Sequence, residues 1–339
     1  MANTSTYRLN FNWLLPIIIF AGLVAVPFWG YATDSSFYVA FFARVMIYAI
    51  AAVALNLALG YGGLISLGHA LFMGLGAYSV AIPSFYGIDN GWLQLLICIS
   101  SCAIVGYITG AISLRTTGIG FIMITLAFAQ MGYFLFVSLK VYGGDDGTSI
   151  TNTSQMLGLN LGDVYTVYAV AFLVLIFSVW WLARLRVSPF GMVIRGARQN
   201  TRRINAIGFS ARRYLIGAYV LSAVLCGIAG FLLANLNAFA SPSVMSWMIS
   251  GDLVVMIVLG GMGSVLGPLY GAFAFFGLEE LLKMITTHWL ALFGLAIVFM
   301  GLMGKKGIVG FFDDLSAWVQ PGAKKGTSKA GDQIKKEAS

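Results

Sequence analysis

Long apolar runs alternate with short polar stretches along nearly the whole chain. A helix needs about 20 apolar residues to cross the hydrocarbon core of a bilayer, so each run is a candidate span. Glycines leave open whether parts of 64–82 and 253–285 are re-entrant half-helices instead. The pattern predicts about ten transmembrane helices: 11–29, 37–59, 64–82, 92–114, 119–139, 164–183, 214–238, 253–267, 269–285 and 289–303.

Composition supports the same class. Of the 339 residues, 59% are hydrophobic and 9% are charged, whereas a soluble domain has roughly a quarter of its residues charged. The mean hydropathy is +0.88. We therefore predict an all-α polytopic membrane protein, with a transmembrane domain over 1–304 and a cytoplasmic tail over 305–339 that is largely disordered at its end.

The loop 184–213 contains no acidic residue and eight arginines: 184, 186, 195, 198, 202, 203, 212 and 213. Short loops this rich in arginine stay on the cytoplasmic side of a membrane. Ser188 followed by Pro189 predicts a helix start, and Gly208 predicts its end. Apolar residues recur at three- and four-residue steps between them, whereas Arg195, Arg198 and Arg202 share another face. The pattern predicts one short amphipathic helix, which either rests on anionic lipid or docks a cytoplasmic partner.

Charge also predicts the orientation of the spans. With the amino terminus inside, the basic residues of the lead, the central loop and the tail all fall on the cytoplasmic side. The same alternation places the polar loop 140–163 on the outer side. The aspartates expected outside are Asp34, Asp89, Asp145, Asp146, Asp163 and Asp252.

Two glycine-rich segments resemble each other. Residues 62–66 (GGLIS) and 260–264 (GGMGS) are each followed closely by a further glycine, Gly68 and Gly267. Interrupted helices of this kind lie near the substrate path of transporters, although glycine-rich spans also produce such similarities by chance. We hypothesise that the two segments form a moving gate with nearby polar residues, which otherwise serve interhelical hydrogen bonding. The gate and path set is Asn56, Gly62, Gly63, Ser66, His69, Thr125, Gln130, Gly260, Gly261 and Gly267, with Thr125 and Gln130 facing the passage.

Signatures of enzymes are missing from the sequence. Neither His69 nor His288 has a partner at metal-ligand spacing, and the chain has neither a nucleophile elbow nor a phosphate loop. Cys98, Cys102 and Cys226 lie inside apolar runs and are expected to be packing residues. We predict no catalytic residue, no metal, no cofactor and no nucleic-acid partner.

Four motifs in order resemble the membrane subunits of branched-chain amino acid ABC importers, and their spacing resembles the LivM type. They are residues 55–70 (LNLALGYGGLISLGHA), 124–130 (ITLAFAQ), 188–191 (SPFG) with the arginine-rich helix, and 259–268 (LGGMGSVLGP). The resemblance covers about 40–305. It implies a permease of the bacterial inner membrane that pairs with a second, homologous permease, two cytoplasmic ATPases and a periplasmic binding protein.

The resemblance also gives the central helix a role, that of a coupling helix seated in an ATPase. The residues concerned are Pro189, Gly191, Arg195, Arg198, Arg202, Ala206 and Gly208. Two other classes stay open, a stand-alone channel or facilitator for a small neutral solute and, less favoured, a membrane-embedded enzyme. The sequence does not choose the substrate among branched-chain amino acids, urea, short amides and aromatic acids.

Overall fold

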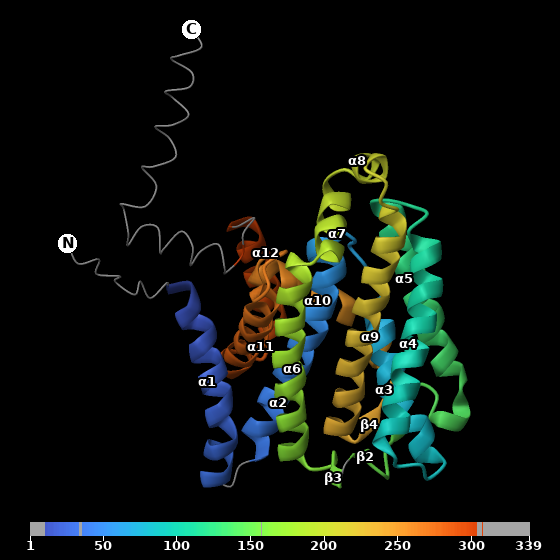
Figure 1. Ribbon diagram of the computed structural model, residues 1–339. Helices are drawn as coiled ribbons and strands as arrows, with labels where there is room; N and C mark the ends of the chain where they lie inside the picture. Colours follow the sequence, from blue (N-terminus) through green and yellow to red (C-terminus); the bar gives the residue numbers. More distant parts are fainter. Residues whose placement is uncertain (1–10, 34–35, 157, 304–306, 308–339) are drawn as a thin grey trace, which may run out of the picture.

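The computed structural model describes residues 11–33, 36–156, 158–303 and 307, and these form a bundle of α-helices (Figure 1). The helices before the arginine-rich loop are α1 (Phe11–Ala32), α2 (Ser36–Asn56), α3 (His69–Phe85), α4 (Gly91–Ser113), α5 (Ile119–Ser138) and α6 (Val164–Val187). The later ones are α7 (Pro189–Gln199), α8 (Thr201–Ala206), α9 (Ala211–Asn237), α10 (Trp247–Gly260), α11 (Gly267–Ile285) and α12 (Trp289–Met303). The tail expected over 305–339 lies outside the described residues, apart from Gly307.

Five helical segments in the described part of the chain are long and apolar enough to cross a membrane. They are Ser36–Tyr61, Gly91–Ser113, Ile119–Ser138, Val164–Val187 and Ala211–Asn237, and shorter apolar helices accompany them. The protein is an all-α polytopic membrane protein, as the apolar runs predicted. Large apolar side chains such as Tyr107, Phe134 and Trp180 are exposed on the outside of the bundle, as expected of a surface that faces lipid.

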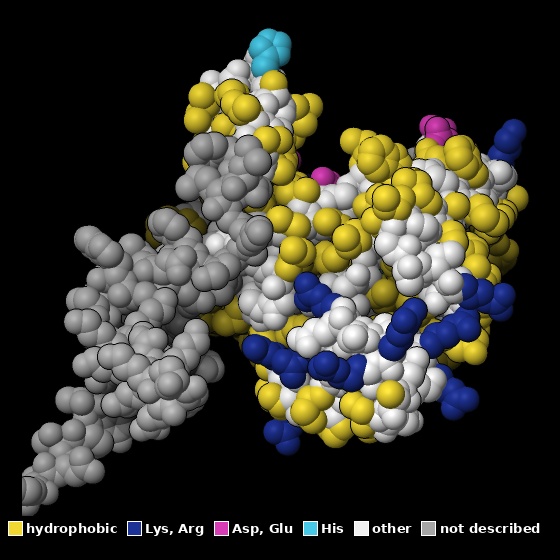
Figure 2. Space-filling view, turned by 90° about the horizontal axis from the view of Figure 1, so that it is seen from above, with side chains coloured by type: hydrophobic (Ala, Val, Ile, Leu, Met, Phe, Trp, Pro, Cys, Tyr) yellow, Lys and Arg dark blue, Asp and Glu magenta, His cyan; other side chains and the backbone are white. Residues whose placement is uncertain are grey.

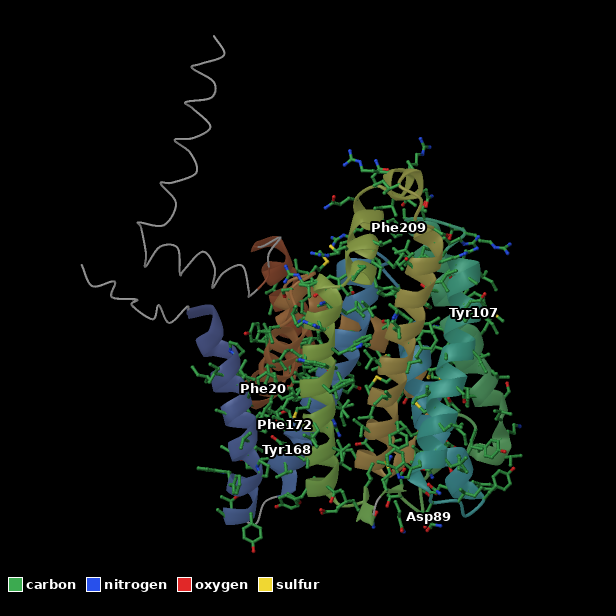
Figure 3. All side chains as sticks on the ribbon, in the orientation of Figure 1. Phe20, Asp89, Tyr107, Tyr168, Phe172 and Phe209 are labelled. Atoms are coloured by element: carbon green, nitrogen blue, oxygen red, sulfur yellow. The ribbon has the colours of Figure 1, made fainter. Side chains whose placement is uncertain are left out.

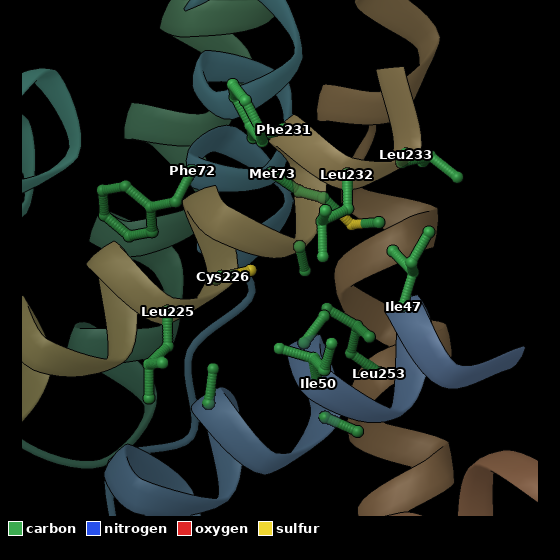
Figure 4. Packing of buried hydrophobic residues seen from close by; sticks show 14 of the residues in the cluster. Ile47, Ile50, Phe72, Met73, Leu225, Cys226, Phe231, Leu232, Leu233 and Leu253 are labelled. Atoms are coloured by element: carbon green, nitrogen blue, oxygen red, sulfur yellow. The ribbon is translucent and has the colours of Figure 1, made fainter. Parts of the chain in front are cut away.

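The centre of the bundle is built where α9 packs against α2, α3 and α4. Glycines allow this close approach, because a side chain at Gly76 or Gly230 would overlap the backbone of the facing helix. The second half of α2 is buried nearly all round, which its continuous apolar sequence permits. Figure 4 shows Cys226 of α9 among the apolar side chains of this core. All three cysteines are free and buried, which confirms their prediction as packing residues.

The two ends of the bundle differ in charge. The hairpin of α7 and α8 projects from one end, and Lys and Arg side chains gather on the face seen from that side (Figures 1 and 2). Asp89 lies at the opposite end, where Figure 3 labels it. Asp252, expected on the outer side, lies in the second turn of α10, because Ser246 caps this helix and it starts six residues before the predicted bound of 253.

The polar stretch 140–163 folds as a small cap on that opposite end. It contains η2 (Lys140–Tyr142), β1 (Thr148–Ser149), β2 (Gln155–Met156) and β3 (Leu159–Asn160). β1 pairs with β4 (Phe239–Ala240), which follows α9, and β2 pairs with β3. The backbone N–H of Ser154 donates to Asn235 Oδ1 over 3.0 Å. The cap is thus fixed to the end of α9 by backbone and side-chain hydrogen bonds.

Candidate functional site

Two helix interruptions meet at the end of the bundle that carries the α7–α8 hairpin. The first follows α2, which continues as the π-helical turn η1 (Leu57–Tyr61) and then as non-helical chain over 62–68. The second is the non-helical stretch 261–266 between α10 and α11. We name the region where 60–68 and 261–266 lie together the junction.

Asn56, the last residue of α2, joins the start of the first interruption to the second one. Its Nδ2 donates to the carbonyl oxygen of Ser264 over 2.9 Å, and its Oδ1 accepts from the backbone N–H of Gly263 over 3.2 Å. The side chain is fully buried. The backbone N–H of Gly263 and the backbone carbonyl of Ser264 lie outside a helix, so no helical hydrogen bond satisfies them. The side-chain amide of Asn56 supplies both partners, which backbone groups in a low-dielectric environment need.

Glycines make the junction possible. Gly63, Gly261 and Gly263 have φ angles of 70°, 115° and 80°, a region that other residues rarely adopt. An added side chain at Gly260 would overlap the backbone of Gly267, so α10 and α11 touch where the chain reverses. The resemblance between the two glycine segments thus corresponds to two real breaks. Neither break has the predicted extent, because α3 begins at His69 instead of residue 64 and α10 ends at Gly260 instead of residue 267.

The short segment before α3 is held by side chains of its own and of α5. The backbone N–H of Leu67 donates to Thr125 Oγ1 over 3.3 Å, and that of Gly68 donates to Ser66 Oγ over 3.2 Å. Thr125 and Ser66 therefore belong to the junction. Gln130 does not join them, because it lies about 140° around α5 from Thr125 and is only half-buried.

His69 is a packed residue at the start of α3. Its Nε2 lies 2.8 Å from Ser222 Oγ, and Ser222 in turn donates to the carbonyl oxygen of Ala54. The hydroxyl proton is used on Ala54, so Nε2 is the donor to Ser222. The imidazole is fully buried and its edge meets the rings of Phe72 and Tyr219. This arrangement joins α3 to α9 and α2.

The arginine-rich loop folds as two helices, not as the single helix predicted. Ser188 caps α7 by accepting from the backbone N–H of Gly191 over 3.2 Å, with Pro189 in the first turn. Asn200 has an extended backbone and caps α8 by accepting from Arg203 N over 3.0 Å. An asparagine competes with the helix for such bonds, which explains the interruption. Gly208 has a φ of 97° and lies two residues after Ala206, the last residue of α8, so the predicted end of the element is confirmed.

Arg198 connects this hairpin to the junction. One of its guanidinium N–H groups donates to the carbonyl oxygen of Gly60. A Cβ atom on Gly63 would lie 2.9 Å from Arg198 Cγ, and one on Gly263 would lie 3.9 Å from its Nη1. The side chain of Arg198 therefore lies next to both interruptions: beside Gly60 and Gly63 of the first, and beside Gly263 of the second.

The other arginines of the predicted face have different surroundings. Arg195 donates to the carbonyl oxygen of Arg186 over 3.0 Å, which holds α7 against the end of α6. Arg202 is exposed on α8. Below them Val193, Ile194 and Ala197 are buried against the bundle, as the apolar spacing predicted. The common face of Arg195, Arg198 and Arg202 is thus divided by the break at Asn200.

Two serines near the junction were not among the predicted site residues. Ser222 lies in α9, and Ser250 of α10 accepts from the backbone N–H of Ala70 over 2.9 Å. Both are fully buried. Their only sequence signal is a hydroxyl within an otherwise apolar run, which is the signal that pointed to Ser66.

These features define the class of protein: a polytopic helical membrane protein with two helix interruptions that meet at one end of the bundle. The model of the family described as branched-chain amino acid transport system / permease component matches residues 37–303. The chain belongs to this family.

Individual relatives are consistent with that membership. The high-affinity branched-chain amino acid transport system permease protein LivM of Escherichia coli is 27% identical over 288 residues, 78% of this chain and 68% of the relative. A probable branched-chain amino acid transport permease protein LivM of Methanocaldococcus jannaschii is 25% identical over 280 residues, 70% of this chain and 78% of the relative. The fructose import permease protein FrcC of Rhizobium meliloti is 26% identical over 180 residues, about half of each chain. No solved structure shows a significant match.

Proposed function

We propose that this chain is the translocation subunit of an ATP-driven ABC importer in a bacterial inner membrane. Its partners would be a second, homologous permease, two cytoplasmic ATPases and a periplasmic substrate-binding protein. The observation that carries the proposal is the contact of Arg198, on the projecting hairpin, with Gly60 at the junction. It gives a movement of the hairpin a direct route to the two helix interruptions.

The surface of the hairpin suits a protein partner. Its outer side exposes Met192, Ile207 and Phe209 beside Arg202 and Arg203. α8 projects beyond the ends of the long helices (Figure 1), which leaves Ile207 beside it accessible to a partner. A mixed apolar and cationic surface at this height fits a groove in a cytoplasmic ATPase better than the plane of the lipid headgroups.

The transmission step follows from the contacts. When an ATPase moves the hairpin, Arg198 moves with it. Its hydrogen bond then shifts the carbonyl of Gly60, and its side chain leaves its place beside Gly63. The second interruption is otherwise held to the end of α2, where the first one starts, by one hydrogen bond that the Asn56 side chain donates and one that it accepts. Hydrogen bonds to a charged group contribute about 1.5–3 kcal/mol, which is enough to bias a two-state element. We propose that the junction opens and closes in this way.

Orientation and substrate complete the proposal. The hairpin end is cytoplasmic, and the cap over 140–163 is periplasmic, where a binding protein would dock. The substrate is a branched-chain amino acid or a related small solute, because the relatives that match over most of this chain are LivM permeases. The fructose permease relative, which matches over half the chain, shows that relatives of this chain serve other solutes.

Uptake into proteoliposomes tests the function. The chain is reconstituted with its second permease and both ATPases, and radiolabelled leucine, urea and benzoate are offered with the binding protein outside. We expect uptake of one solute that requires ATP inside and stops with vanadate. A stand-alone channel would instead give ATP-independent uptake by the chain alone, and that result would contradict the proposal.

A further inference from the structure

A cavity of about 530 Å³ opens beside the junction, at the end of the bundle where the basic side chains gather (Figure 2). Its walls come from four separate parts of the chain: the interruption after α2, the turn between α4 and α5, the α7–α8 hairpin and the start of α9. The polar lining includes Arg198, Arg212, Asn205, Thr117 and Ser210. None of the described residues that line it is acidic.

The polar groups present donors to the cavity. Asn205 accepts a hydrogen bond from the backbone N–H of Ala211 over 3.1 Å, so its oxygen is occupied and its NH₂ group is the part available to a ligand. Arg212 uses one N–H on the carbonyl oxygen of Ala111 over 2.8 Å, and Arg198 uses one on Gly60. A guanidinium has five N–H donors, so each arginine retains others for a ligand.

Two long helices begin at this cavity and add to its positive potential. α5 starts at Ile119 and α9 at Ala211, and the cavity is lined by Gly118 and Ser210 directly before them. The positive end of each helix dipole favours an anion, and this holds for α9 although its first N–H, that of Ala211, is already used on Asn205. Together with the two guanidinium groups and the amide, these helix ends make this a site for an anionic group.

Apolar side chains make up another part of the lining of the cavity. Leu64, Leu114, Phe121, Ile122 and Leu215 line it, and α4, α5 and α9 all have an end here. Ile119 is largely exposed, so the apolar surface continues from the cavity onto the side of the bundle that faces lipid. A ligand that satisfies both the cationic and the apolar parts of this lining has an anionic head and an apolar body.

We propose that this cavity binds the phosphate headgroup of an anionic phospholipid from the adjoining leaflet. Arg212 and the NH₂ group of Asn205 hold the phosphate, and the acyl chains leave past the half-buried Ile122 toward the exposed Ile119. Basic pockets between transmembrane helices recognise anionic lipids through this combination of charge and apolar surface. The inference goes beyond the transport function, because it assigns a lipid ligand. Since the cavity is also lined by Gly62 and Gly63, a bound lipid touches the junction itself.

Native mass spectrometry of the purified full-length chain tests the site. The chain is released from mixed micelles containing phosphatidylglycerol or phosphatidylcholine, and retained lipid is counted. We expect retention of phosphatidylglycerol and not of phosphatidylcholine. Arg212→Gln removes the main phosphate donor and Asn205→Asp replaces the NH₂ group with an anionic oxygen that still accepts from Ala211, so each lowers retention roughly tenfold or more.

Arg213→Gln is the matched control, because Arg213 is an exposed neighbour with the same charge that does not line the cavity. It keeps wild-type retention. Equal losses in Arg212→Gln and Arg213→Gln would show that only surface charge attracts the lipid, and would overturn the site. Equal retention of the two lipids would overturn it as well. Displacement of the lipid by millimolar inorganic phosphate would assign the cavity to a soluble anion and contradict the lipid source.

Discussion

The two hydrogen bonds of Asn56 give a quantitative prediction for the junction. Asn56→Ala leaves the backbone N–H of Gly263 and the carbonyl of Ser264 without their partner. A buried backbone group without a partner costs about 1–3 kcal/mol. Both contacts are only partly buried, so the lower figure applies to each. We expect the variant to lose about 2 kcal/mol of unfolding free energy.

The buried cysteines supply the assay. Cys98, Cys102 and Cys226 are free and inaccessible in the folded protein, so a fluorogenic thiol reagent reports their exposure during a thermal melt. Asn160→Ala is the control. It likewise removes an amide with two hydrogen bonds, here both accepted by Asn160 Oδ1 from Thr153 and Gly162, but at an exposed position where water replaces it. Its change should stay within about 0.5 kcal/mol. Identical melting curves for the two variants would refute the role of Asn56.

Three further predictions concern the helix contact, the hairpin contact and the orientation. Gly260→Ala should abolish folded protein in size-exclusion chromatography because its Cβ would overlap backbone, whereas Gly251→Ala, with open space around it, should be tolerated; equal yields would contradict the close contact of α10 and α11. Gly63→Leu should assemble with the ATPases yet lose import, because its side chain meets the flexible Arg198 and displaces it; normal import would contradict the contact's role. In intact cells an impermeant thiol reagent should label Asp146→Cys and not Arg202→Cys, and the reverse result would invert the orientation.

The helices with polar flanks could be predicted closely from the sequence. α4 and α5 begin and end within one residue of their predicted bounds, because a cap or turn residue such as Asn90 or Gly118 adjoins each apolar run. α10 was misplaced because Ser250 and Asp252 resemble loop residues. The partner that uses Ser250 is the backbone of Ala70, 180 residues away, and sequence spacing does not reveal such a pair.

The candidate site was predictable as a set of parts and not as an arrangement. The glycine segments indicated both interruptions, and Asn56 stood out as an amide in an apolar run. That this amide joins the two interruptions depends on how α2 packs against α10 and α11. Likewise, eight similar arginines occupy the loop, and only the folded hairpin determines that Arg198 is the one that reaches Gly60.

The central claim is that Arg198 links the movement of the hairpin to the junction. The most direct measurement is the ratio of solute imported to ATP hydrolysed in proteoliposomes that contain the complete transporter, for Arg198→Gln and for Arg202→Gln. The two variants lose the same charge from the same hairpin, but only Arg198 contacts Gly60. We predict that Arg198→Gln assembles and hydrolyses ATP with a much lower ratio, while Arg202→Gln keeps the wild-type ratio. Equal ratios in the two variants would contradict the claim.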